Sequence, residues 1–134
     1  MTREQVVVDA SVVVGLLIDP SARGDEIAAR LESCQLHAPD HVLVEVTNVL
    51  RRLRNAASLS DAEARLGVDA LASLSIQLWP WEVVATRAWQ LGNNYSSYDA
   101  AYVALAEHLG IVLLTSDARL SRAPGATCPV EVFG

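Results

Sequence analysis

The chain of 134 residues has a net charge of -6, and 51% of its residues are hydrophobic, which is enough for the core of a single domain. The negative charge argues against a protein that binds nucleic acid through its overall charge. All ten basic residues are arginine, and the absence of lysine excludes Walker-type phosphate loops and disfavours receiver domains and haloacid-dehalogenase-type phosphatases, which pair an acidic pocket with a lysine.

The hydrophobic pattern predicts strands that alternate with helices along the whole chain. The run VVV before Asp9 is typical of a buried strand, and the following ASVVVGLLI predicts a short helix that ends at Asp19-Pro20. In chain order we expect strands at 5–8, 36–38, 76–79, 111–114 and 130–133, and helices at 10–18, 25–33, 41–56, after Ser60, 82–92, 97–109 and 117–121.

Several residues predict where these helices begin and end. Asp40 is the expected N-cap of the helix at 41–56, Ser60 and Glu63 form a capping box, and Gly92 and Gly110 end helices. The expected strands are apolar throughout instead of alternating, which indicates a parallel sheet covered on both faces. We therefore expect an α/β three-layer fold in which a central parallel sheet of about five strands is flanked by helices.

Cysteines, histidines and the N-terminus indicate a reduced, intracellular protein. Cys34 and Cys128 are far apart, which favours free thiols over a disulfide, and the three histidines have no metal-ligand spacing. The segment MTREQVVVDA is too short and too polar for a signal peptide, and no apolar run approaches the ~18 residues of a membrane span. We expect a soluble cytoplasmic protein that does not associate with membranes.

Most acidic residues have an ordinary explanation as parts of solvated surfaces, and Glu4 and Glu131 lie near the termini. We expect Glu26 to face Arg30 and Asp61 to face Arg65, because residues four positions apart are neighbours on a helix. Each such pair contributes about 0.3–0.5 kcal/mol.

Four other acids lie next to segments that we expect to be buried, where an ionised carboxylate is costly. Asp9 and Asp117 each follow a buried strand and precede a helix, at the edge of a parallel sheet where ligands bind. Asp99 lies in the first turn of the helix at 97–109, and Glu45 lies at the margin of the apolar stripe of the helix at 41–56. Each has a structural alternative, as an N-cap, as an anion favoured by the helix dipole, or as a rim residue.

Together, the four carboxylates predict a cation site if they converge. Two carboxylates ~4 Å apart repel by about 4 kcal/mol at an effective dielectric of ~20, so a cluster must protonate, separate or bind a cation. Oxygen ligands without histidine or thiolate favour Mg²⁺ or Mn²⁺. Ser11 and Thr115, two residues from Asp9 and Asp117 respectively, are placed to orient the carboxylates or a bound water.

The segments VVVDAS, PDHVLVEVTNVL, YDAAYVALA and LLTSDARL, in this order, resemble the PIN-domain ribonucleases, and more narrowly the VapC-type toxins of bacterial toxin–antitoxin pairs. YDAAYVALA is the most specific part of a resemblance that covers nearly the whole chain. It implies one PIN-like domain over residues 1–134. Its implied catalytic and metal-binding residues are Asp9, Glu45, Asp99 and Asp117, with Ser11, Asn48 and Thr115 as supporting polar residues.

The resemblance also implies an activity and partners. The activity is a Mg²⁺-dependent endoribonuclease, in which Mn²⁺ can substitute, that hydrolyses RNA phosphodiester bonds with a metal-activated water. The partners are a cognate VapB-type antitoxin, which lays an apolar segment across the helices and a basic side chain into the acidic pocket, and a second copy in a homodimer.

Contacts to the RNA substrate have to come from local arginines, because the chain is acidic overall. The candidates are Arg51, Arg52 and Arg119, which are equally explained as helix C-terminal charges. Trp79, Trp81 and Trp89 match no motif of the family, and we expect core or rim residues instead of platforms for RNA bases.

Two alternatives remain open at the level of sequence. The first is a catalytically inactive PIN-like binding module, against which the complete set of acids argues. The second is a phosphatase or receiver with an acidic pocket, against which the absent lysine argues.

Overall fold

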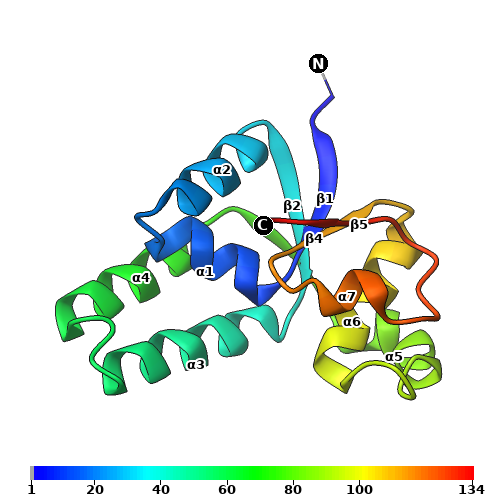
Figure 1. Cartoon of the computed structure of the whole chain (residues 1–134). Helices are drawn as coiled ribbons and strands as arrows, with labels where there is room; N and C mark the ends of the chain where they lie inside the picture. The colour runs from blue at the N-terminus through cyan, green and yellow to red at the C-terminus, as the bar shows by residue number, and fades with distance from the viewer. Residues whose placement is uncertain (1) are drawn as a thin grey trace.

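In the computed structural model, which describes residues 2–134, five parallel strands form one sheet in the order β3-β2-β1-β4-β5 (Figure 1). The strands are β1 (Glu4–Val8), β2 (Cys34–Pro39), β3 (Ile76–Trp79), β4 (Val112–Thr115) and β5 (Val130–Val132). The central strand β1 pairs with β2 and β4, and Val6, Val7 and Val8 have no exposed surface. Burial on both faces explains why this strand is apolar without alternation.

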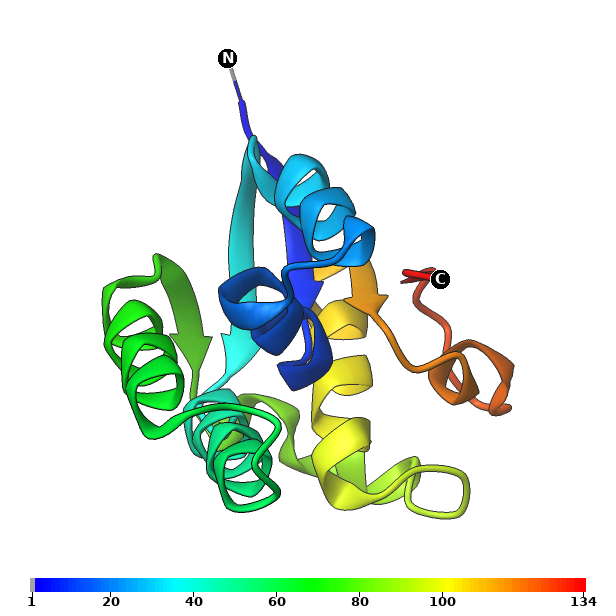
Figure 2. The same cartoon turned by 60° about the vertical axis from the view of Figure 1, so that its left-hand side comes forward.

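Helices cover both faces of the sheet. One group contains α1 (Ala10–Ile18), α2 (Ala22–Leu31), α3 (Val42–Asn55) and α4 (Asp61–Ser73), of which α1 and α2 contact the sheet while α3 and α4 pack against α1. The other group contains α5 (Trp81–Gln90) and α6 (Ser97–Leu109), and the short α7 (Arg119–Arg122) follows β4. The two groups lie on opposite sides of the sheet (Figures 1 and 2), which confirms the three-layer fold.

The expected elements all form, with boundaries that differ by a few residues. Helix α2 begins at Ala22 because Ser21 caps it, its hydroxyl accepting a hydrogen bond from the backbone N–H of Arg23 at 3.3 Å. The prediction that Asp40 caps α3 is wrong, because the cap position belongs to His41. The backbone N–H of Asp40 instead donates to the Trp79 carbonyl at 2.9 Å.

Among residues 2–134, neither Glu26 with Arg30 nor Asp61 with Arg65 forms the expected ion pair. Arg30 and Asp61 pair with residues of other elements instead. Arg30 pairs with Glu4 at 2.9 Å and with Glu131 at 2.8 Å, which ties α2 to β1 and β5. Asp61 lies 3.6 Å from Arg54.

The cysteines are free thiols, as expected: Cys34 is buried and Cys128 half-buried. The thiol of Cys34 donates to the Arg30 carbonyl at 3.3 Å. Within residues 2–134, every helix is too short or too polar to cross a membrane.

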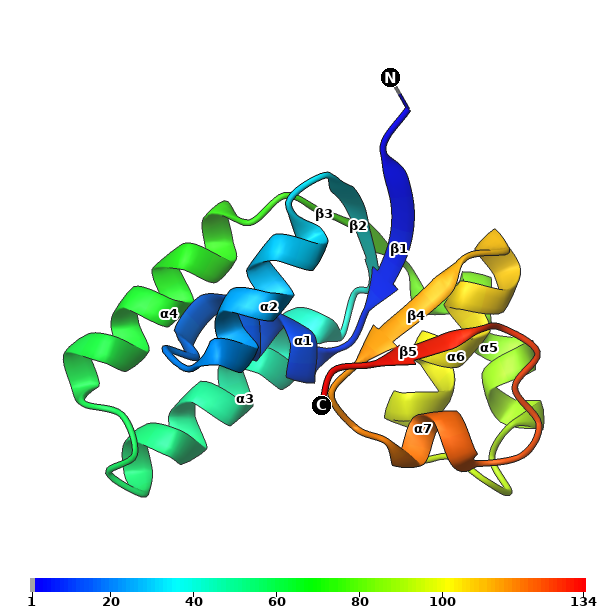
Figure 3. The same ribbon diagram turned by 45° about the horizontal axis from the view of Figure 1, so that its top comes forward.

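The order in which strands are added to the sheet reverses at β1, and such a reversal marks a candidate ligand site. β2 and β3 lie on one side of β1, whereas β4 and β5 lie on the other. Val8, the last residue of β1, pairs with Leu114 of β4. The segments after β1 and β4 therefore leave the sheet at the same edge (Figure 3), where open α/β sheets bind ligands.

Candidate active site

Asp9 is the first residue after β1 and the N-cap of α1, and the residue is only 6% exposed. Its Oδ1 accepts hydrogen bonds from the Ser11 hydroxyl at 2.6 Å and the Val12 N–H at 3.1 Å, and its Oδ2 accepts one from the Thr115 hydroxyl. Burial raises the pKa of Asp9 in spite of these bonds, and the negative charge of Glu45 raises the pKa further. Asp9 is therefore both a helix cap and a buried carboxylate.

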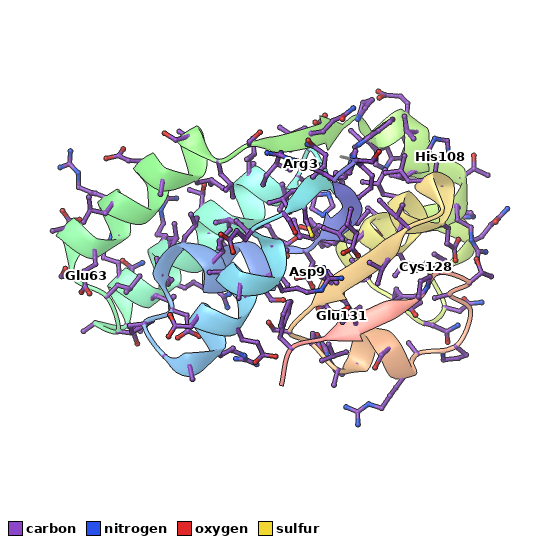
Figure 4. All side chains as sticks on the ribbon, turned by 90° about the horizontal axis from the view of Figure 1, so that it is seen from above. Arg3, Asp9, Glu63, His108, Cys128 and Glu131 are labelled. Atoms are coloured by element: carbon purple, nitrogen blue, oxygen red, sulfur yellow. The ribbon has the colours of Figure 1, made fainter. Side chains whose placement is uncertain are left out.

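Ser11 and Thr115 link the segments that follow β1 and β4. The Thr115 hydroxyl also accepts a hydrogen bond from the Asp117 N–H at 3.0 Å, and the Ser11 hydroxyl accepts one from the Ser116 N–H at 2.9 Å. Ser11 and Thr115, two of the three expected supporting residues, thus contact Asp9, which lies near the middle of the molecule (Figure 4).

Glu45 approaches the same region from α3. It lies half-buried beside a stripe of buried residues on that helix, and its Oε1 accepts a hydrogen bond from the Tyr102 hydroxyl at 3.0 Å. The buried Nε2 of His41 lies 3.3 Å from the same oxygen without forming a hydrogen bond. Tyr102 did not emerge from the sequence, although it lies one helical turn after Asp99.

Tyr102 holds Glu45 in place without neutralising it. Tyr102 is 1% exposed, and burial together with the charge of Glu45 raises the pKa of its hydroxyl far above the ordinary value. The hydroxyl therefore stays protonated and can only donate to the carboxylate.

Asp99 lies half-buried in the first turn of α6. The helix is capped by Ser96, whose hydroxyl accepts a hydrogen bond from the Asp99 N–H at 3.1 Å. Burial raises the pKa of Asp99, and so do the negative charges of Glu45 and Asp117. Carboxylates on α3, on α6 and after β4 therefore act on one another.

Asp117 differs from the other three acids because it has a cation of its own. Both of its oxygens accept hydrogen bonds from the Arg119 guanidinium, at 3.0 and 3.1 Å from Nε. This interaction lowers the pKa of Asp117. To bind a metal ion, Asp117 would have to exchange its bonds with Arg119.

Two hollows meet at Glu45. A cleft of about 450 Å³ between α3 and α6 is lined by Glu45, Asn48 and Asp99, and a groove of about 540 Å³ along α1 and α3 is lined by Glu45, Ser11 and Ser116. Across residues 2–134, no three histidine, cysteine, aspartate or glutamate side chains are arranged as a metal site. The acids thus lie close enough for their charges to shift the pKa values of Asp9 and Asp99, but they are not arranged as a complete set of metal ligands.

The arginines expected to contact RNA lie in three different places. Arg119 pairs with Asp117, and Arg52 lines the groove that reaches Glu45. Arg51 lines a separate hollow between α3 and α4, and it lines neither of the two hollows that contain Glu45.

The PIN domain family model matches residues 6–126. The chain belongs to the PIN domain family. Ribonuclease VapC12 of Mycobacterium tuberculosis is 38% identical over 127 residues, which cover 95% of this chain and 98% of that protein. Ribonuclease VapC3 of the same species is 39% identical over 120 residues, which cover 90% of this chain and 88% of that protein. The resemblance to VapC-type PIN domains is thereby confirmed.

Solved structures similar to this PIN domain agree with its fold. The DNA-bound VapBC of Salmonella typhimurium has a TM-score of 0.70 at 11% identity and is matched over 98% of this chain and 99% of that chain. VapC20 of Mycobacterium tuberculosis, described as a sarcin-ricin loop cleaving toxin, has a TM-score of 0.63 at 22% identity, over 87% of this chain and 93% of that chain. At such identities, these structures support the fold alone.

The raised pKa of Asp99 predicts that Asp99→Asn stabilises the PIN domain at neutral pH in EDTA. The folded state binds this proton more readily than the unfolded state, so stability falls as the pH rises from the ordinary value of 3.8 through the raised one. The amide avoids this loss, and we expect its melting temperature at about pH 7 to exceed that of the wild type by a few degrees.

The gain should shrink as the pH falls toward the ordinary pKa, which thermal unfolding followed by circular dichroism would measure. Asp69→Asn, at an exposed position of α4, is the matched control and should give no gain. A lower melting temperature of Asp99→Asn at neutral pH would contradict the electrostatic account.

Proposed function

We propose that this PIN domain is a Mg²⁺-dependent endoribonuclease and the toxin of a VapBC-type toxin–antitoxin pair. The observation that carries the proposal is the position of Glu45, which lines one cleft with Asp99 and whose negative charge raises the pKa of both Asp9 and Asp99. The ribonuclease names of the VapC relatives support the same activity.

The cleft between α3 and α6, called the acidic cleft below, is lined by Glu45 and Asp99. Together with the nearby Asp9, these residues fit a divalent cation bound through oxygen. Carboxylates are ligands that Mg²⁺ and Mn²⁺ prefer. Burial and repulsion raise the pKa of both Asp9 and Asp99, so a bound cation would offset an existing electrostatic cost. Asp9, Glu45 and Asp99 would hold the cation, and Asp117 would join them on releasing Arg119.

When bound, the cation supplies a water of lowered pKa and a positive charge that stabilises the reacting phosphate. The chain's own residues position the ligands: Ser11 and Thr115 hold the oxygens of Asp9, and Tyr102 holds Glu45. Asn48 lines the same cleft and offers an amide to a phosphate or sugar oxygen. Arg119, whose side chain is 78% exposed, is placed to exchange Asp117 for an RNA phosphate.

The groove along α1 and α3 suits an antitoxin segment. Apolar side chains from the first helices and the α3–α4 connection line it: Val14, Ile18, Val49, Leu53 and Leu59. Because Glu45 lines both this groove and the cleft that contains Asp99, an apolar segment lying in the groove could extend a basic side chain to that cleft. Proteins of the same fold form VapBC assemblies, and the proposed antitoxin follows that precedent.

A separate apolar patch suits a homodimer. It is formed by the first turns of α3, α5 and α6, where Val44 is 73%, Trp81 67% and Tyr98 64% exposed. Exposed apolar patches of this kind mark interaction surfaces. Val44 and Tyr98 also line the cleft that contains Asp99, so a dimer through this patch would bring two acidic clefts close together.

Incubation of the antitoxin-free protein with total RNA tests the nuclease. We expect new 5′ ends with Mg²⁺ or Mn²⁺ and none with EDTA or with Asp9→Asn, whereas Asp69→Asn should cut like the wild type. Mn²⁺ should also raise the melting temperature of the wild type through linkage, but not that of Asp99→Asn. Cutting that persists in EDTA would refute the proposed chemistry, and equal metal effects without cutting would favour the inactive binding module.

The antitoxin groove predicts that Leu53→Asp weakens capture of the cognate antitoxin, because an aspartate there would be buried beneath an apolar segment. We expect at least a roughly tenfold loss of affinity by calorimetry. Leu66→Asp, at a 68% exposed position of α4 outside the groove, is the control and should bind normally. Equal affinities of the two variants would place the antitoxin elsewhere.

The homodimer predicts that Val44→Asp halves the molar mass measured by light scattering, since a charge at the centre of the patch would oppose its burial. Leu66→Asp again serves as the control, and circular dichroism would verify that both variants fold. A Val44→Asp variant that keeps the mass of the wild type would exclude this patch as the dimer interface.

A further inference from the structure

We infer that the corner between α5 and α6 holds one unpaired base of the RNA substrate beside the acidic cleft. This inference rests on the proposed ribonuclease function. The corner consists of the last turn of α5, residues 91–96 and the first turn of α6. Its central side chain is Trp89.

Trp89 presents an aromatic ring that the rest of residues 2–134 leaves uncovered. It is 87% exposed, so the expectation of a core or rim residue is wrong at this position. Trp79, by contrast, is half-buried and donates its indole N–H to His37 at 3.1 Å. An exposed indole offers a flat face on which a base of any identity can stack.

The hollow beside Trp89 has the chemistry of a base site. Its volume is about 680 Å³, and Gln90, Asn93 and Ser97 line it with amide and hydroxyl groups that can both donate and accept hydrogen bonds. No charged side chain of the described residues lines it. A nucleobase is planar and uncharged and carries donors and acceptors along its edge, so it fits this lining better than a phosphate or a basic peptide segment does.

The corner is held in shape by its own buried residues. Leu91 is 2% and Tyr95 7% exposed. The backbone N–H of Tyr95 donates to the Leu91 carbonyl at 3.2 Å, and its hydroxyl donates to the Ala123 carbonyl at 3.0 Å. These contacts fix the corner to the segment after α7, so a base would bind a site that needs little further ordering.

Ser96 connects the base site to the acidic cleft. It lines both hollows, and its hydroxyl caps the helix turn that carries Asp99. Figure 2 shows the corner and the start of α6 at the same end of the molecule. A strand whose phosphate lies among the carboxylates would therefore place a neighbouring base at Trp89.

Cleavage kinetics on a short single-stranded RNA that spans a mapped cut would test the base site. Trp89→Leu keeps an apolar side chain but removes the ring, and we expect it to raise KM roughly tenfold while kcat changes little. Trp89→Phe keeps a ring and should stay close to the wild type. Leu66→Ala, at a 68% exposed position of α4 outside the hollow and outside the dimer patch, is the control and should cut like the wild type.

An abasic nucleotide in the RNA separates stacking from other effects. At one position near the cut, its presence should raise KM roughly tenfold for the wild type but hardly at all for Trp89→Leu, because the stack is already lost. If Trp89→Leu cuts every RNA like the wild type, the base site is refuted and the nuclease stands. If Trp89→Leu weakens antitoxin capture but not cleavage, the corner is a protein-docking surface, which also refutes the base site. If the wild type cuts no RNA, both proposals fail.

Discussion

The hydrogen bonds that hold Asp9 between the ends of β1 and β4 are the interaction on which the rest of the site depends. Ser11 and Thr115 each donate to one of its oxygens, and the same two hydroxyls accept hydrogen bonds from the backbone after β4. One network therefore joins two neighbouring strand ends and caps α1. The carboxylate at its centre is buried, which raises its pKa, and in the proposed nuclease a bound cation would offset this cost.

Glu45 lies where the proposed antitoxin site and the proposed RNA site adjoin. It lines both the groove that suits the antitoxin and the cleft that contains Asp99. In the proposed toxin, an antitoxin side chain and the RNA substrate would compete for this carboxylate. The pairing of Asp117 with Arg119 adds a local cation to an acidic protein, at the place where an RNA phosphate would bind.

The pattern of apolar runs and of residues that end helices and strands was enough to predict most of the secondary structure. The helix Ala10–Ile18, the strand Ile76–Trp79 and the helix Ser97–Leu109 have the expected bounds, because apolar runs, Pro80 and Gly110 act within a few residues. The ion pairs could not be predicted in this way. Arg30 finds Glu131 across 101 residues of chain only because β5 lies in the same sheet.

The sequence by itself determined which acids stand at strand ends and helix starts, since the apolar runs that form the buried strands and helices flank these acids in the chain. Only the tertiary structure decided which residues far away in the chain contact these acids. Tyr102 reaches Glu45 from another helix across 57 residues, and Trp89 stays exposed although we expected a core or rim residue. The reason is physical: helix and strand formation depend on neighbours in the chain, whereas hydrogen-bond partners and exposure depend on which elements the parallel sheet brings together.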